Sequence, residues 1–445
     1  MLLRETHRYH LHRQGRYLWA AFKRPHRVLS TCKVNGGLRE DLTHVANHQS
    51  CEGVAHNRQP GLAQSPLPGL DAFHVQSCRE AQLPPATTAL MSTAANMQCA
   101  VLAQAEHEEL CVSVVATAGV LGNATRAGDP AGWHEQPEGS RPIRRSDSSR
   151  ADTQAEADAD SDVNVNVNVN ANAGAGAGAH PDGVAIEELS MAEPTVARLR
   201  PSPDETGAGT IVLLVFINQP CTPACLTRAA TVVTEGKSTA LLDLRMPSLQ
   251  SAGLATGTGT DQLVIAAPLL SSGGSEQRWQ PQWERHWAGG HNSLGELLGR
   301  ATHAAVTRCI LLQNGVCAEL RRSICAALAR HGCDEAELRA QARAALAAPE
   351  AELFARNLTA LIHDPQSAAA AYALAEIIDL ARAGVLHTEV AREALINQAA
   401  LLAAAVAVAP EQFAALREAL QPHHDLAPGA LAARAVALGF ARKWT

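Results

Sequence analysis

The chain has 445 residues and 46% of them are apolar, so it is long enough for two or three domains with at least one well-buried core. Its formal net charge of −7 provides no overall positive field for nucleic acid or anionic lipid, which favours a small-molecule partner. Residues 1–16 are basic and rich in His but lack the apolar core of a secretory signal, and the eleven cysteines form no CxxC pair. We therefore expect a cytoplasmic protein with reduced thiols and no metal site.

The first hundred residues show mostly strand and turn signals. Two β-rich runs, 16–22 and 27–34, flank KRPH, and this predicts an antiparallel hairpin that ends at the NGG turn. A helix is expected over 39–48 and a long loop over 50–85. A strand-to-helix transition then follows over 86–107, with Asn96 near the start of that helix.

A central strand is predicted over 110–118, and it runs into a loop of small and polar residues. This loop carries Asn123, Arg126 and Asp129, at an edge where open α/β sheets commonly form a ligand crevice. The alternative is that Arg126 and Asp129 pair with each other and Gly128 only turns the chain.

Residues 140–200 are charged and Ser-rich and then become DVNVNVNVNANAGAGAGAH, which predicts a disordered insertion. The closure cost of a flexible loop rises only logarithmically with its length, so one catalytic domain over 1–333 can contain this insertion. The insertion is either a flap over the site or a passive excursion.

Order resumes with buried strands over 209–218 and 262–268, which alternate with helices over 225–244 and 293–312. This alternation predicts an α/β catalytic domain in which a mixed sheet is flanked by helices. Residues 334–445 are rich in alanine and predict a separate all-α appendage, in which the apolar run 399–409 is a helix packed in protein rather than a membrane span. The appendage leaves a homo-oligomer as an open hypothesis.

Three further segments contain groups that can do chemistry. The loop 254–262 carries Thr258, Thr260 and Asp261, but it lacks the GxxxxGK[ST] pattern and precedes a strand, which favours a hydrogen-bonding wall or an acid/base site over a phosphate loop. Asn218 directly follows a central strand. On the helix after it, only one of Glu235 and Lys237 can face a pocket, because residues two apart on a helix lie on different faces. The alternative for Lys237 is a solvated surface charge.

His291 precedes a predicted helix cap at Asn292 or Ser293, with Glu296 as a capping-box partner in the first turn. The GxSxG and HExxH signatures of familiar hydrolases are absent from the sequence.

Six segments, in this order along about residues 17–312, resemble the adenosylcobinamide amidohydrolase family: VNGGL, LMSTAANM, VVATAGVLGNATRAGDPA, INQPCTPACLTRAATVVTEGKSTALLDL, GLATGTGTD and GGHNSLGELLGRA. The resemblance implies hydrolysis of the amide that joins the aminopropanol arm to the corrin ring, with the cobalt corrinoid as substrate and no separate cofactor. The insertion and the helical tail depart from the family pattern.

Hydrolysis of an unactivated amide requires a nucleophile, oxyanion stabilisation and a proton for the leaving amine. Asp261 or His291 is the candidate base for water, His291 or Lys237 the candidate acid, and Thr258 or Thr260 the nucleophile of a covalent alternative. The remaining candidates are substrate contacts at Asn96, Asn123, Arg126, Asp129, Asn218 and Thr260. A non-catalytic corrinoid-binding or escort protein is the rival function, and a nucleotide-dependent enzyme is a third.

Overall fold

A computed structural model describes residues 1–50, 69–136, 139–143, 178–179, 183–189, 209–270, 283–316 and 321–443. The chain divides into two compact units, Met1–Gly315 and Val316–Thr445. The change in composition along the sequence predicts this boundary between residues 333 and 334. In the structure, however, Ile324, Leu328 and Cys333 belong to the core of the helical unit.

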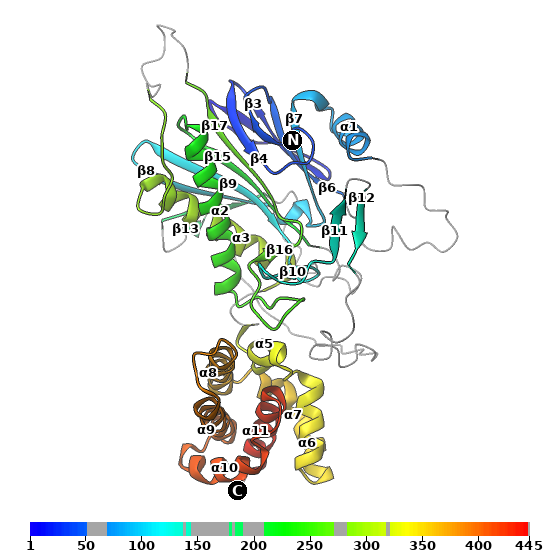
Figure 1. The fold of residues 1–445 in the computed structure, drawn as a ribbon, viewed down its shortest axis with the longest axis vertical. Helices are drawn as coiled ribbons and strands as arrows, with labels where there is room; N and C mark the ends of the chain where they lie inside the picture. Colours follow the sequence, from blue (N-terminus) through cyan, green and yellow to red (C-terminus); the bar gives the residue numbers. More distant parts are fainter. Residues whose placement is uncertain are drawn as a thin grey trace, which may run out of the picture. The chain divides into compact units, whose positions relative to one another are not determined.

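The first unit is built on an eight-stranded sheet with the order β13-β14-β8-β9-β15-β17-β4-β5 (Figure 1). Strands β15 and β17 are parallel, while β9 is antiparallel to β15 and β4 is antiparallel to β17. The predicted mixed sheet is therefore confirmed. Its strands are Gly178–Ala179, Ala185–Glu188, Val101–His107, Leu110–Ala118, Ile211–Ile217, Gln262–Pro268, His26–Ser30 and Gly37–Arg39.

The central strands are buried on both faces because a layer covers each side. All seven residues of β15, IVLLVFI, are buried. Helices α2 (Pro223–Asp243) and α3 (Ser293–Asn314) pack side by side on one face of the sheet (Figure 1). A continuous apolar strand is the pattern expected for such a doubly covered position.

A second sheet of five strands covers the other face, in the order β1-β2-β3-β6-β7. Its strands are Leu2–Glu5, Tyr9–Gln14, Tyr17–Phe22, His44–Gln49 and Thr88–Thr93. Leu11, Leu18 and Met91 of this sheet form one core with Val212 and Leu214 of β15. Helix α1 (Leu70–Glu80) packs on the outer face of the second sheet through Cys78, beside Tyr17 and Leu90.

Four predictions for the N-terminal half are wrong. The expected hairpin does not form, because β3 pairs with β2 and β6 whereas β4 pairs with β17 and β5 in the other sheet. The helix expected over 39–48 is strand β6, and the helix expected after Asn96 is strand β8. Helix α1 lies within the segment expected to be loop. In each case pairing with distant strands or packing on a sheet overrides the local signal.

The disorder predicted over 140–200 lies mostly outside the described residues. Strands β13 and β14 are exceptions, because β14 pairs antiparallel with β8 of the main sheet and β13 pairs with β14 at the edge. Strands β11 (Trp133–Gln136) and β12 (Gly139–Pro142) form a separate antiparallel pair, which runs into the first residues of that segment.

The second unit is helical, as predicted. Its helices are α5 Ile324–Leu328, α6 Glu335–Ala345, α7 Ala348–Ile362, α8 Pro365–Arg382, α9 Thr388–Ala407, α10 Phe413–Leu420 and α11 Pro428–Ala441. A Cβ added at Gly439 of α11 would stand 2.3 Å from the Ala403 carbonyl oxygen of α9, so small residues allow these helices to pack closely. Among the described residues, α9 alone is long and apolar enough to cross a membrane, and half of its most apolar window is buried inside the protein.

Candidate active site

The candidate site forms where the end of β9 lies beside the starts of β15 and β17. Because β9 is antiparallel to β15, Ala118 at the end of β9 pairs with Ile211 at the start of β15. The loop after β9 therefore meets the loops that precede the other two strands. The loop after β9 and the loop before β17 are joined by a small antiparallel sheet of two strands, β10 (Ala124–Thr125) and β16 (Gly257–Thr258).

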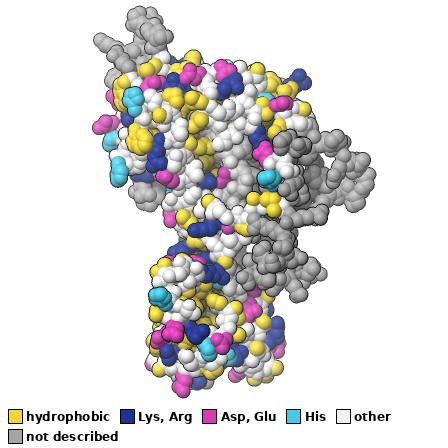
Figure 2. Space-filling model, in the orientation of Figure 1, with side chains coloured by type: hydrophobic (Ala, Val, Ile, Leu, Met, Phe, Trp, Pro, Cys, Tyr) yellow, Lys and Arg dark blue, Asp and Glu magenta, His cyan; other side chains and the backbone are white. Residues whose placement is uncertain are grey.

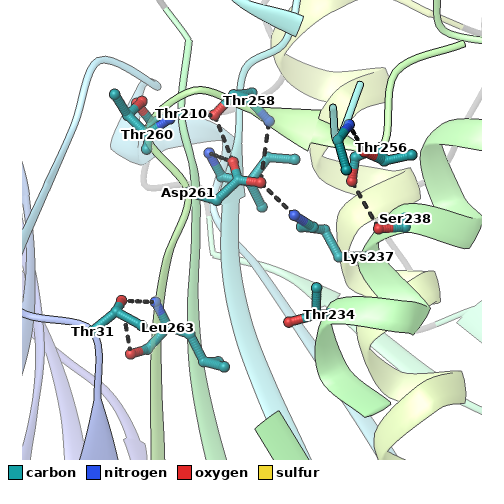
Figure 3. A network of polar contacts seen from close by, with 12 residues as sticks. Thr31, Thr210, Thr234, Lys237, Ser238, Thr256, Thr258, Thr260, Asp261 and Leu263 are labelled. Atoms are coloured by element: carbon teal, nitrogen blue, oxygen red, sulfur yellow. Dashed lines mark hydrogen bonds and ion pairs between the residues drawn. The ribbon is translucent and has the colours of Figure 1, made fainter. Parts of the chain in front are cut away.

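Asp261 is the centre of a polar network at this edge (Figure 3). Its Oδ1 accepts hydrogen bonds from Thr258 Oγ1 at 2.5 Å and from the backbone N–H of Ile211 at 3.3 Å. Its Oδ2 accepts from Lys237 Nζ at 2.5 Å and from the backbone N–H of Thr258 at 3.1 Å. Four donors therefore fix the orientation of this carboxylate.

Lys237 reaches Asp261 from the buried face of α2. Its side chain is 11% exposed and that of Asp261 is 20% exposed. The alternative in which Lys237 is a solvated charge is therefore wrong. Glu235 points elsewhere and lies 3.5 Å from Arg228 on the surface, as expected for two helix positions on different faces.

Gly257 allows this ion pair to lie against the backbone. A Cβ at Gly257 would stand 2.3 Å from Asp261 Oδ2 and 2.6 Å from Lys237 Nζ, and real Cβ atoms do not approach other atoms so closely. The ion pair therefore requires a residue without a side chain at position 257.

The network continues outward from the buried ion pair to solvent. Thr260 is exposed, and its Oγ1 lies 2.7 Å from Thr210 Oγ1 and accepts from Asn123 Nδ2 at 3.3 Å. Asn123 Nδ2 also donates to the Gly209 carbonyl oxygen. Amide and hydroxyl groups thus line the outer side of the candidate site.

Arg126 and Asp129 form a turn next to this network. The Asp129 carboxylate accepts from the Arg126 backbone N–H at 2.7 Å and from Ser248 Oγ at 2.5 Å. Arg126 Nη1 donates to the Leu254 carbonyl oxygen, and Gly128 turns the chain with φ +97°. This is close to the alternative in which Arg126 and Asp129 pair with each other and Gly128 only turns the chain. The difference is that Asp129 binds the backbone N–H of Arg126 and not its guanidinium.

The pKa of Asp129 is lowered from its ordinary value. Burial acts to raise this pKa, but hydrogen bonds from Ser248, Ser251 and the Arg126 backbone together outweigh burial, with a further contribution from the Arg126 charge. The turn therefore favours an ionised Asp129.

Asn96 lies at this edge through the last turn of α3. Its side chain caps a short 3₁₀ helix, Met97–Cys99, by accepting from the Gln98 N–H. Its backbone N–H donates to Gln313 Oε1 at 2.8 Å, and the neighbouring Asn314 Oδ1 accepts from the Val120 N–H at 3.0 Å. The end of α3 thus holds the loops that follow β7 and β9.

The structure does not bring Asn218 and His291 to this site. Asn218 follows the far end of β15, about 20 Å from Ile211 at strand spacing, and there it bonds to the β8–β9 turn at Cys111 N–H and Glu109 O. His291 precedes the first turn of α3, whose last turn reaches Asn96, so it lies about 30 Å away along the helix. Both residues were predicted for the wrong edge of the sheet.

Asn292 is the N-cap of α3 and accepts from the Leu294 N–H, as predicted. Glu296 was predicted as its capping-box partner, but it instead pairs with Arg300 one turn later at 2.8 Å. Across the described ranges, no group of three or more His, Cys, Asp or Glu side chains is placed to hold a metal ion.

Three groups of this network are not among the predicted site residues: the Thr210 hydroxyl, the Gly209 carbonyl and the Ile211 N–H. These residues directly precede or begin β15, so their position in the sequence is a possible signal. It identifies them as site residues only once the antiparallel orientation of β9 is known. Chemically, the network offers a hydroxyl in contact with a carboxylate that a buried ammonium holds in place, beside the exposed Thr260 hydroxyl and the half-buried Asn123 amide.

Comparison with known proteins adds two findings. The family model for adenosylcobinamide amidohydrolase matches residues 2–318. A protein of Methanocaldococcus jannaschii named as uncharacterized is 24% identical over 312 residues, which cover 67% of this chain and 95% of that protein.

Proposed function

Because the chain belongs to the adenosylcobinamide amidohydrolase family, we propose that it hydrolyses the amide that joins the aminopropanol arm of adenosylcobinamide to the corrin ring. The products are adenosylcobyric acid and 1-amino-2-propanol, and the reaction serves cobinamide salvage for cobalamin synthesis in the cytoplasm. The cobalt belongs to the substrate.

The contact between Thr258 and Asp261 supports this edge as the reaction centre. A hydroxyl 2.5 Å from a carboxylate oxygen, with Lys237 on the other oxygen, is the arrangement of nucleophile, base and orienting group used in covalent amide hydrolysis. Asp261 takes the proton of Thr258 as Oγ1 attacks the amide carbon. Lys237 keeps the carboxylate in position and balances its charge.

The same proton then leaves with the product. Asp261 transfers it to the aminopropanol nitrogen as the C–N bond breaks, which leaves an ester on Thr258. Water then hydrolyses this ester: Asp261 takes a proton from the attacking water and returns it to Thr258 Oγ1 as the ester bond breaks, which releases the corrinoid acid. Thr260 supplies an exposed hydroxyl on the solvent side, where the many amides of a corrinoid need hydrogen-bond partners, and the half-buried Asn123 amide holds this hydroxyl in place.

The direct test is mass spectrometry of adenosylcobinamide incubated with the purified full-length protein. We expect a product with one carboxylate in place of the aminopropanol amide, together with free aminopropanol. Substrate binding without this product, unchanged in Asp261→Ala, would instead favour a corrinoid-binding or escort protein.

Variants separate the two chemical routes. We expect Asp261→Asn and Thr258→Val to lower kcat by a hundredfold or more, in the range of lost acid–base and nucleophilic groups, while Thr258→Ser keeps the hydroxyl and stays within about tenfold. Wild-type turnover in Thr258→Val would transfer the nucleophile role to water, and wild-type turnover in Asp261→Asn would remove this site from the reaction. His291→Ala is the control and is expected to leave kcat unchanged.

A further inference from the structure

A cavity lies at the edge of the main sheet opposite the Asp261 network. It has a volume of about 200 Å³ and is lined by the β1–β2 turn, by His26, by the β8–β9 pair and by the last residues of β15, Phe216 and Ile217. The Asp261 network contacts β15 at its first residue, Ile211, so the two places are about 20 Å apart along one strand. The proposed hydrolysis makes no use of this cavity.

The cavity has an excess of positive charge. Arg4 and Arg8 line it. His7 lines it too, but burial and the neighbouring Arg8 charge lower its pKa from 6.5, so this imidazole is mainly neutral at pH 7. The charge of Arg4 is offset by Glu187, whose Oε2 lies 3.7 Å from Arg4 Nη1, and Arg4 also donates a hydrogen bond to Gln104. Across the described ranges no carboxylate forms an ion pair with Arg8, and burial together with the nearby Arg24 charge lowers its pKa.

The other titratable groups around Arg8 form no ion pair with it in the described part of the chain. Glu106, which is close enough to help raise the pKa of the Cys111 thiol, accepts a hydrogen bond from Gln104 Nε2 instead. Glu5, at the end of β1, is held by Lys23 at 2.7 Å and by His10 at 2.9 Å. Burial lowers the pKa of His26 to about 4, and its Nδ1 donates to the Arg24 carbonyl oxygen at 2.7 Å, so this imidazole is neutral near pH 7. Burial raises the pKa of the Cys111 thiol to about 11, so it is neutral too.

An aromatic wall stands beside this charge. Tyr9 stacks on Phe216 with ring centroids 4.2 Å apart, and both residues line the cavity. The volume is below the range of about 300–1,000 Å³ that is usual for drug-sized ligands, so the occupant is small. A half-buried guanidinium without a carboxylate partner is stabilised by an anion that it can bind with two N–H groups.

We propose that this cavity is a second ligand site, which binds a phosphate group through Arg8, either as free phosphate or as the monoester of a small organic molecule that packs on the aromatic wall. The site is separate from the amide-cleaving edge and does not depend on the proposed reaction.

The test is a titration of the full-length protein with inorganic phosphate and with phenyl phosphate, at an ionic strength kept constant with sodium chloride. Binding is measured by calorimetry, and the rise in Tm with ligand concentration is measured in parallel. We expect saturable binding in the wild type and at least tenfold weaker binding in Arg8→Gln. Tighter binding of phenyl phosphate identifies an organic monoester as the ligand class, and equal binding identifies free phosphate.

Controls make the result specific. Arg79→Gln removes an exposed charge from α1 and is expected to bind phosphate as the wild type does, as is Asp261→Asn. Without ligand, Arg8→Gln is expected to have a Tm at or above that of the wild type, because it removes a cation from a positive cluster. If Arg8→Gln does not fold, Arg8→Lys replaces it. We expect this variant to bind phosphate several-fold more weakly than the wild type, because an ammonium cannot make the bidentate contact of a guanidinium. No saturable binding in the wild type, or wild-type affinity in the Arg8 variant, overturns the proposal.

Discussion

Gly257 is the residue whose replacement tests the Lys237–Asp261 pair most directly. Its missing Cβ leaves room for both charged groups, so Gly257→Ala is expected to separate the pair and to lower kcat at least tenfold. Gly259→Ala is a matched control two residues away, since a Cβ there meets nothing within 4 Å. Steady-state turnover and thermal unfolding of both variants provide the measurement. Equal turnover in the two variants would show that the close approach at Gly257 has no role in the reaction.

Asp129 is expected to make stability depend on pH. Its pKa is lower in the folded protein than the ordinary value of 3.8, so its contribution is present above that value and is lost as the pH falls through the folded-state pKa. Asp129→Asn should therefore be less stable than the wild type at pH 7, by about 1–2 kcal/mol for a lost charged hydrogen bond. Urea unfolding at pH 7 and at about pH 3 measures this, and the difference between the two proteins should shrink at the lower pH. A difference that is constant with pH would assign the effect to packing instead of charge.

At the scale of elements, the crossing of α2 and α3 depends on one glycine and not on its neighbour. A Cβ at Gly236 would stand 2.9 Å from the Gly299 carbonyl oxygen, whereas a Cβ at Gly299 would meet Val232 at an ordinary 3.8 Å. We expect Gly236→Ala to destabilise the protein by about 1–3 kcal/mol through overpacking. Gly299→Ala should be neutral or stabilising by up to about 1 kcal/mol, since alanine is the better helix former. Chemical unfolding compares them, and destabilisation by Gly299→Ala alone would contradict this account of the crossing.

At the scale of the whole molecule, the sequence predicts what is local and misses what depends on distant pairing. Strand β15 is recognisable from the sequence because its seven residues, IVLLVFI, are all apolar. Helix α2 is recognisable because Thr222 and Pro223 mark its start. Residues 44–49 have few strand formers, and they become β6 because β3 and β7 lie on either side.

The candidate site divides in the same way. Asp261 and Lys237 can be predicted as site residues from the sequence, Asp261 by its residue type at the end of a polar loop and Lys237 by its position on a helix face. Their neighbours depend on which end of each strand faces which edge. The antiparallel orientation of β9 brings Asn123 beside Thr260, and it leaves Asn218 at the other end of the sheet. Residue spacing alone contains no information on that orientation.

The helical unit is expected to be dispensable for amide hydrolysis, provided that α3 is left complete. The family match ends at residue 318, and the last turn of α3 supplies Gln313 and Asn314, which accept the N–H groups of Asn96 and Val120. A chain of residues 1–318 should therefore hydrolyse adenosylcobinamide within about twofold of the full-length rate. A chain that stops at residue 309 leaves both N–H groups without these partners, each at a cost of about 1–3 kcal/mol, and should lose stability and turnover together. Product formation and Tm for the two truncations, with Gln313→Ala in the full-length chain as the point control, test this. If the 1–318 chain folds but has no turnover, the helical unit contributes to the reaction itself.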